Sequence, residues 1–144
     1  MSVPNGPSAL QQVVQLRERE QERVGAVLAE QERTRQRFVT SISQLGDLMD
    51  QAGATGALSP TLAANLGAYK LSVLDLADRH RTALAQHESQ MDQTRLALHE
   101  AFRRREAVAQ LHERRLEEGE RALHVAERKR TDDIAQTVWL RGRS

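Results

Sequence analysis

The sequence of 144 residues contains no cysteine and has only two phenylalanines, one tyrosine and one tryptophan. Without cysteine it cannot form a disulfide framework, a thiolate zinc site or a cysteine nucleophile. Charged residues make up 28% of the chain, and so few large apolar side chains are a poor basis for a globular core. The composition therefore favours long helices.

Long apolar runs are also missing. No stretch approaches the roughly 20 residues that span a bilayer. The opening segment MSVPNGPSAL lacks the basic flank and apolar stretch of a signal peptide. We therefore expect a soluble protein that is not exported through a signal peptide.

The usual motifs of catalysis and metal binding are absent from the sequence. No two of the five histidines are four residues apart, which is the spacing of a helical zinc site. The chain shows neither a phosphate-binding glycine loop nor a nucleophile elbow, and a pair of helices offers no water-excluding pocket. We expect no enzymatic activity, no catalytic residue, no metal and no cofactor.

Proline and glycine divide the chain into two helices. Prolines occur only at positions 4, 7 and 60, which leaves two long stretches without proline, 8–59 and 61–144. Ser8 and Ser59 are good N-caps for helices in these stretches. We predict an all-α fold, a long antiparallel two-helix coiled-coil hairpin whose second helix overhangs the first. As one elongated domain over residues 1–144, it has a helix at 8–52, a turn at 53–59, a helix at 60–136 and a flexible tail at 137–144.

Apolar residues in the first helix follow a heptad pattern, which predicts an a/d seam. If the turn centres on Gly56, facing residue numbers sum to about 112. This register sets Leu45 near Leu66, Phe38 near Val73 and Leu10 near Phe102. Beyond Phe102 the second helix has no partner within the chain, yet apolar residues continue at helical spacing. Such a stripe invites an external partner, and fraying or self-association is the alternative.

Charge is distributed unevenly along the chain. Residues 39–102 carry four basic against seven acidic residues, a net −3, whereas residues 103–144 carry eleven against eight, a net +3. Acids in the second region cancel most of its positive field, and aromatic residues do not alternate with the basic ones, so we expect no nucleic-acid binding. An acid precedes a base by three residues at eight places, which favours intrahelical ion pairs: 20/23, 30/33, 32/35, 78/81, 92/95, 100/103, 118/121 and 127/130.

Three groups of residues carry a family resemblance that covers nearly the whole chain. The segment 129–136, KRTDDIAQ, followed by Arg141, is the most specific, and the segment 44–48, QLGDL, precedes the expected turn. The third group follows the turn and consists of Asn65, Tyr69, Val73, Leu76 and His80. Together they resemble the flagellar export protein FliJ and its relatives in virulence type III secretion.

This resemblance implies a non-enzymatic central stalk of the export ATPase complex, at the cytoplasmic face of the inner-membrane export apparatus. The stalk would promote assembly of the hexameric ATPase FliI and contact the export gate protein FlhA, with export chaperones as further candidate partners. It would contact no small-molecule substrate and no membrane except through these partners. A generic coiled-coil scaffold or homodimerisation module is the alternative function.

Two sets of candidate contact residues follow. Family positions flanking the turn imply gate binding by Gln44, Leu48, Tyr69, Val73, Leu76 and His80. The chain departs from the family at Gln51 and Thr55, where tyrosines are common, and packing within the hairpin is the alternative role of the set. For the ATPase contact we select charges of both signs on the basic overhang, which suit a thin helix inside a ring, and intrahelical pairing is their alternative role: Arg128, Lys129, Arg130, Asp132 and Asp133, with Ile134.

Overall fold

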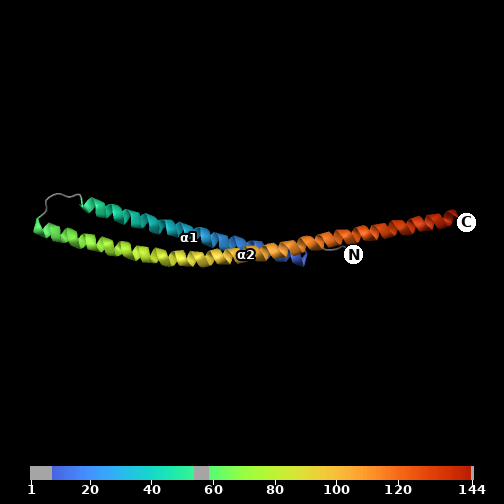
Figure 1. Ribbon diagram of the computed structural model, residues 1–144, viewed down its shortest axis with the longest axis horizontal. Helices are drawn as coiled ribbons and strands as arrows, with labels where there is room; N and C mark the ends of the chain where they lie inside the picture. The colour runs from blue at the N-terminus through green and yellow to red at the C-terminus, as the bar shows by residue number, and fades with distance from the viewer. Residues whose placement is uncertain (1–7, 54–58, 144) are drawn as a thin grey trace. The chain divides into compact units, whose positions relative to one another are not determined.

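The computed structural model describes residues 8–53 and 59–143, and within them it contains two α-helices and no strand. Helix α1 spans Ala9–Gly53 and helix α2 spans Pro60–Gly142 (Figure 1). The two helices pack against each other, which confirms the predicted all-α hairpin. No helix in this described part of the chain is long and apolar enough to cross a membrane.

Both helices begin where serine caps them. The Ser8 hydroxyl accepts a hydrogen bond from the backbone N–H of Gln11 at 3.2 Å, and the Gln11 side chain accepts one from the Ser8 N–H at 2.9 Å. This reciprocal pair is a capping box. The Ser59 hydroxyl accepts from the Leu62 N–H at 3.3 Å, and Pro60 occupies the first helical position, where its missing N–H costs nothing.

Helix α2 continues to Gly142, past residue 136, where we expected a flexible tail to begin. No glycine or proline interrupts the sequence between Gly119 and Gly142. Two side-chain contacts lie in these last turns: the Thr137 hydroxyl donates to the Asp133 carbonyl at 2.8 Å, and the Arg143 guanidinium lies 4.3 Å from the Trp139 ring centroid. Residues 54–58 of the expected turn lie outside the described part of the chain.

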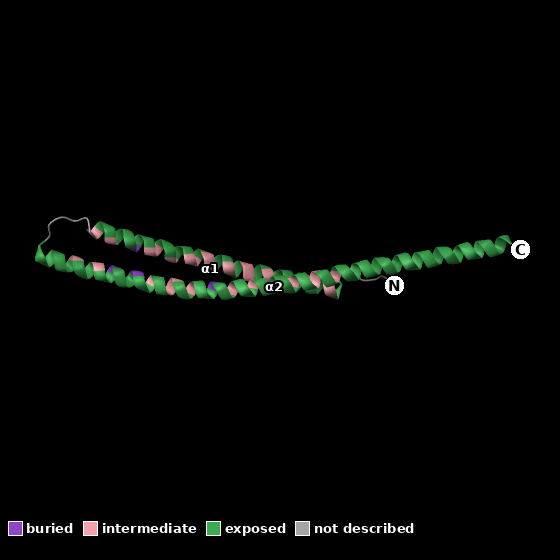
Figure 2. Cartoon of the chain, viewed as in Figure 1, coloured by how far each residue is buried: buried purple, intermediate pink, exposed green. Residues whose placement is uncertain are grey.

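Contacts divide the chain into two compact units, residues 21–101 and residues 1–20 with 102–144. In the first unit α1 and α2 run antiparallel (Figure 1). Its core is small, and the few buried residues are coloured purple in Figure 2: Leu45, Val73, Ala77, Met91 and Ala101. Met49 packs against the cluster of Leu45, Val73 and Ala77.

The register of this seam differs from the one we predicted. Leu45 packs with Val73 and Ala77 instead of Leu66, and Phe38 lies against the rings of His80 and His87, with centroids 6.2 and 6.0 Å away, instead of Val73. In both cases the nearer partner lies one heptad farther along α2 than predicted, and Ala77 and His87 lie farther along still. A shift of seven residues leaves the same face of a helix on the seam, so the apolar pattern fits either register, and centring the turn on Gly56 selected the wrong one.

The second unit shows a displacement in the same direction. Leu10 lines a cavity of about 270 Å³ together with His112 and Leu116, which follow the predicted partner Phe102 by 10 and 14 residues. From residue 113 to residue 143 every residue of α2 is exposed (Figure 2). We call residues 113–143 the C-terminal arm. Apart from Arg115 and Leu116, which line the cavity with Leu10, it is the unpartnered stretch that the sequence predicted, beginning later than Phe102.

The thin seam makes single core residues important for stability. Met91 is 1% exposed, whereas Leu96, five residues along the same helix, is 67% exposed. We expect Met91→Ala to lower the free energy of unfolding by about 2 kcal/mol, the low end for a buried large-to-small change, because a two-helix seam relaxes easily. Leu96→Ala is the matched control and should change it by less than about 0.5 kcal/mol. Urea unfolding followed by circular dichroism measures both, and equal effects would contradict this core.

Candidate partner-binding interface

The structure separates the six residues that the family pattern assigned to gate binding. Val73 is 6% exposed and packs with Leu45, so it belongs to the seam. His80 places its ring edge-on against Phe38, and its Nδ1 atom is buried without a hydrogen-bond partner. For these two residues, packing within the hairpin is the role that the geometry supports.

The other four residues, Gln44, Leu48, Tyr69 and Leu76, are exposed. Tyr69 and Leu76 are seven residues apart on α2 and therefore share one face. Leu62, a further seven residues before Tyr69, is also exposed and joins that face. We call Leu62, Tyr69 and Leu76 the tip face. Heptad spacing from Tyr69 could have found Leu62, which the family pattern did not include.

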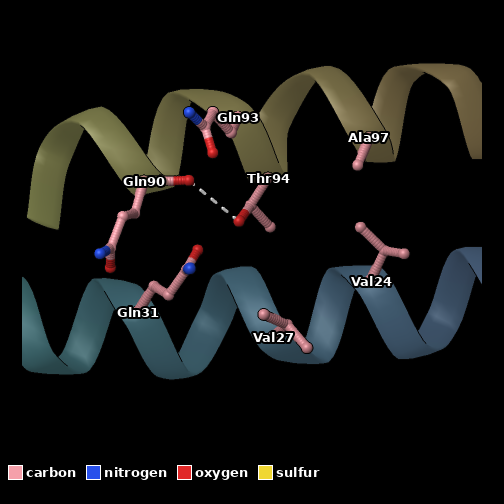
Figure 3. A pocket seen from close by; sticks show the side chains of 7 residues that line it. All are labelled: Val24, Val27, Gln31, Gln90, Gln93, Thr94 and Ala97. Carbon is pink, nitrogen blue, oxygen red and sulfur yellow. Dashed lines mark hydrogen bonds between the residues drawn. The ribbon is translucent and has the colours of Figure 1, made fainter.

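A groove of about 460 Å³ opens between the helices of the first unit (Figure 3). Two valines, an alanine, a threonine and three glutamines line it: Val24, Val27, Gln31, Gln90, Gln93, Thr94 and Ala97. The lining holds no titratable group, and the Thr94 hydroxyl donates to the Gln90 carbonyl at 3.1 Å. The groove thus has none of the acids, bases or activated nucleophiles that a catalytic site needs.

Polar side chains also interrupt the seam close to this groove. The backbone carbonyl of Gln31 lies 2.7 Å from His87 Nε2, a hydrogen bond that joins α1 to α2. The side-chain oxygen of Gln31 is buried without a partner. Buried polar groups of this kind lower stability but restrict which residues can face one another. No group of three histidines or carboxylates in the described ranges, 8–53 and 59–143, can hold a metal ion.

An ion-pair cluster joins the helices in the second unit. Glu20 accepts hydrogen bonds from Arg17 at 2.9 Å and from Arg104 on α2 at 3.2 Å. The Arg17 hydrogen bond is the main reason that the pKa of Glu20 lies below its ordinary value of 4.5, and the charge of Arg104 lowers this pKa further. Arg33 and Arg35 likewise lower the pKa values of Glu30 and Glu32.

Ion pairs along the helices follow the predicted spacing only in part. The pairs 30/33, 32/35, 78/81 and 92/95 form. The pairs 118/121 and 127/130 do not form in the described structure. Exposed ion pairs contribute little free energy because they compete with hydration of the charges. The absence of these two pairs on an exposed helix is consistent with that small energy.

The six residues selected for ATPase binding all lie on the C-terminal arm and are exposed. None of their charged members, Arg128, Lys129, Arg130, Asp132 and Asp133, forms an ion pair within the part of the chain that the structure describes. Ile134 is 58% exposed. Intrahelical pairing, the alternative that we considered for these charges, is therefore not what the structure shows.

The Glu20 cluster gives a pH prediction. Because its folded pKa is lowered, Glu20 stabilises the fold above its ordinary pKa, and this stabilisation is lost as the pH falls below 4.5 through the folded value. We expect Glu20→Gln to lower the melting temperature at neutral pH, with the difference from the parent chain disappearing in acid. Glu18→Gln is the control, since Glu18 is exposed and forms no ion pair in the described structure. Equal melting temperatures for the Glu20 variant and the parent at neutral pH would contradict this.

Comparison with known proteins gives one match. The family model described as "Flagellar FliJ protein" matches residues 7–144, essentially the whole chain. No curated protein and no solved structure matches. Members of this family are non-catalytic components of flagellar protein export. The chain therefore belongs to the FliJ family and has a role in flagellar export.

Proposed function

We propose that this chain is the central stalk of the flagellar export ATPase complex, where it promotes assembly of the FliI ring and couples the ring to the export gate protein FlhA. The observation that carries the proposal is the C-terminal arm, in which every described side chain is exposed along a continuous helix. At ~1.5 Å per residue, residues 113–143 extend over about 45 Å. An arm of this kind can enter the centre of a ring without unfolding.

The charges of the arm suit such a contact. A shaft that meets successive subunits of a ring makes small contacts, which favour polar over large apolar surfaces. Arg128, Lys129 and Arg130 are followed closely by Asp132 and Asp133, so the arm presents both signs within two turns. Ile134 adds an exposed apolar contact beside them. We assign these six residues to the ATPase contact.

The tip face supplies the contact with the gate. Tyr69 and Leu76 are apolar, exposed and on one side of α2, and aromatic anchors of this kind dominate many interfaces. We assign Gln44, Leu48, Tyr69 and Leu76 to FlhA and add Leu62. Val73 and His80 support this surface from within the hairpin.

The proposal also fixes where the chain works. A stalk of this complex lies in the cytoplasm, at the inner-membrane export apparatus, and reaches the membrane only through FliI and FlhA. In this role the chain hydrolyses nothing itself and needs no cofactor, while export chaperones are further candidate partners.

Charge reversal on the arm tests the ATPase contact. We expect the full-length variant with Arg128, Lys129 and Arg130 all changed to glutamate to lose most of its ability to stimulate hydrolysis by FliI, because buried or ring-facing charge pairs tolerate no sign change. The matched control changes Arg114, Arg115 and Arg121 to glutamate, with the same change in net charge on the same arm. Hydrolysis rates over a saturating range of chain concentration provide the measurement. Undiminished stimulation by the first variant, or equal loss in both, would exclude this site.

A pair of single substitutions tests the gate contact. Tyr69→Ala removes the exposed anchor of the tip face, and we expect it to weaken binding to FlhA by about 30-fold, the cost of an interface hot spot. Leu71→Ala is the control, because Leu71 is 69% exposed and two residues away, on the other side of the helix. Calorimetric titration of both variants measures the affinities. A tip face that binds FlhA equally well without Tyr69 would disprove the assignment.

A further inference from the structure

The C-terminal arm carries a short pattern that complements itself. Leu123 and Ile134 are 66% and 58% exposed and are eleven residues apart, so they lie on one face of α2. Glu127 and Arg130 lie between them on the same face. We call Leu123, Glu127, Arg130 and Ile134 the arm face. From its N-terminal end the order is apolar, acid, base, apolar.

We infer that the arm face binds the arm face of a second copy of this chain in an antiparallel pair. Read in the opposite direction, the order becomes apolar, base, acid, apolar. In an antiparallel arrangement about a twofold axis, Leu123 therefore meets Ile134 of the other copy, and Glu127 meets its Arg130. The symmetry repeats each contact, which gives two apolar contacts and two ion pairs. A parallel arrangement would instead place like charges opposite each other.

Charge complementarity favours a second copy of this chain as the partner of the arm face. Glu127 and Arg130 are three residues apart, yet no ion pair forms between them, so both remain available. Within about one turn the face offers one charge of each sign, and the same face, reversed, offers the opposite sign at each position. A uniformly acidic or basic partner would satisfy one charge and oppose the other.

The neighbouring residues permit close approach. Gly119, Ala122 and Ala126 flank one side of the arm face, and small side chains allow two helices to pack at short interaxial distances. The contact covers only about three turns, from Leu123 to Ile134, which is below the size of a standard stable interface. The pair is therefore a reversible dimer rather than an obligate one.

Self-pairing of the arm face does not depend on the proposed function, but it would compete with the proposed contact with FliI. Arg130 and Ile134 belong both to the arm face and to the residues assigned to FliI. One arm cannot present them to a second copy and to the ring at the same time. Self-pairing would thus cover the arm of the free chain and release it when a ring competes for it.

Sedimentation of the full-length chain at low salt, at concentrations up to a few hundred micromolar, tests the pairing. Arg130→Glu sets Glu127 of each copy against glutamate, and we expect it to weaken self-association at least about tenfold. Glu127→Arg should do the same. The double variant Glu127→Arg with Arg130→Glu restores opposite charges across the pair, and it should associate within about threefold of the parent chain. Circular dichroism confirms that the helix content is unchanged.

Lys129→Glu is the matched control, because it makes the same charge change one residue away and off the arm face. It should change association by no more than about twofold. A parent chain that is monomeric throughout the concentration range would overturn the inference. Failure of the double variant to recover, or an effect of Lys129→Glu as large as that of Arg130→Glu, would overturn it as well.

Orientation can be measured separately because the chain has no cysteine. Leu123→Cys and Ile134→Cys are made in separate full-length chains and mixed under mild oxidation. The antiparallel pair predicts a disulfide between the two different chains. Crosslinks that form only between identical chains would show a parallel arrangement and contradict the proposal.

Discussion

A helix of 83 residues has more surface than a partner of 45 residues can cover. This mismatch within one hairpin is the constraint on which the other features depend. Where α1 runs beside α2, a seam of apolar side chains holds the two together. Beyond it, residues 113–143 have to stay helical on their own. Their glutamate, arginine, alanine and leucine content has high helix propensity, and continuation from an existing helix avoids the cost of nucleation.

The seam that anchors this arm is thin and partly polar. Only five described residues are buried, two of them alanines, and the His87 ring lies within hydrogen-bonding distance of the Gln31 carbonyl. Such a seam buries less apolar surface than an all-apolar one. Its few hydrogen bonds favour one register of α1 against α2 over the others. The Glu20 cluster serves a similar purpose near the base of the arm, since Arg104 joins α2 to α1 there. On the proposed function, both features hold the hairpin in register while the arm engages a ring.

Local features of this fold were predictable from sequence, but the pairing was not. Ser8 and Ser59 mark the helix starts correctly because a cap depends only on its neighbours. The contact between Leu45 and Val73 was missed because a heptad repeat fits equally well after a seven-residue shift. That shift keeps the same face of α2 on the seam, so Val73 lies in the seam in either register and only its partner changes. The shift sets His80 against Phe38, whereas Tyr69 is exposed. The sequence shows which arm residues are charged, but it does not show whether Glu127 and Arg130 form an ion pair. The attraction within an exposed pair is nearly balanced by the loss of hydration.

Backbone hydrogen exchange with and without FliI tests the central claim most directly. An arm stabilised only by its own helix should exchange much faster than the seam residues of 21–101. The account predicts that adding FliI slows exchange across residues 113–143, most strongly around 128–134, and leaves the tip face unchanged. An arm whose exchange is unaffected by FliI, with slowing confined to residues 21–101, would contradict the claim that the arm is the working surface of this protein.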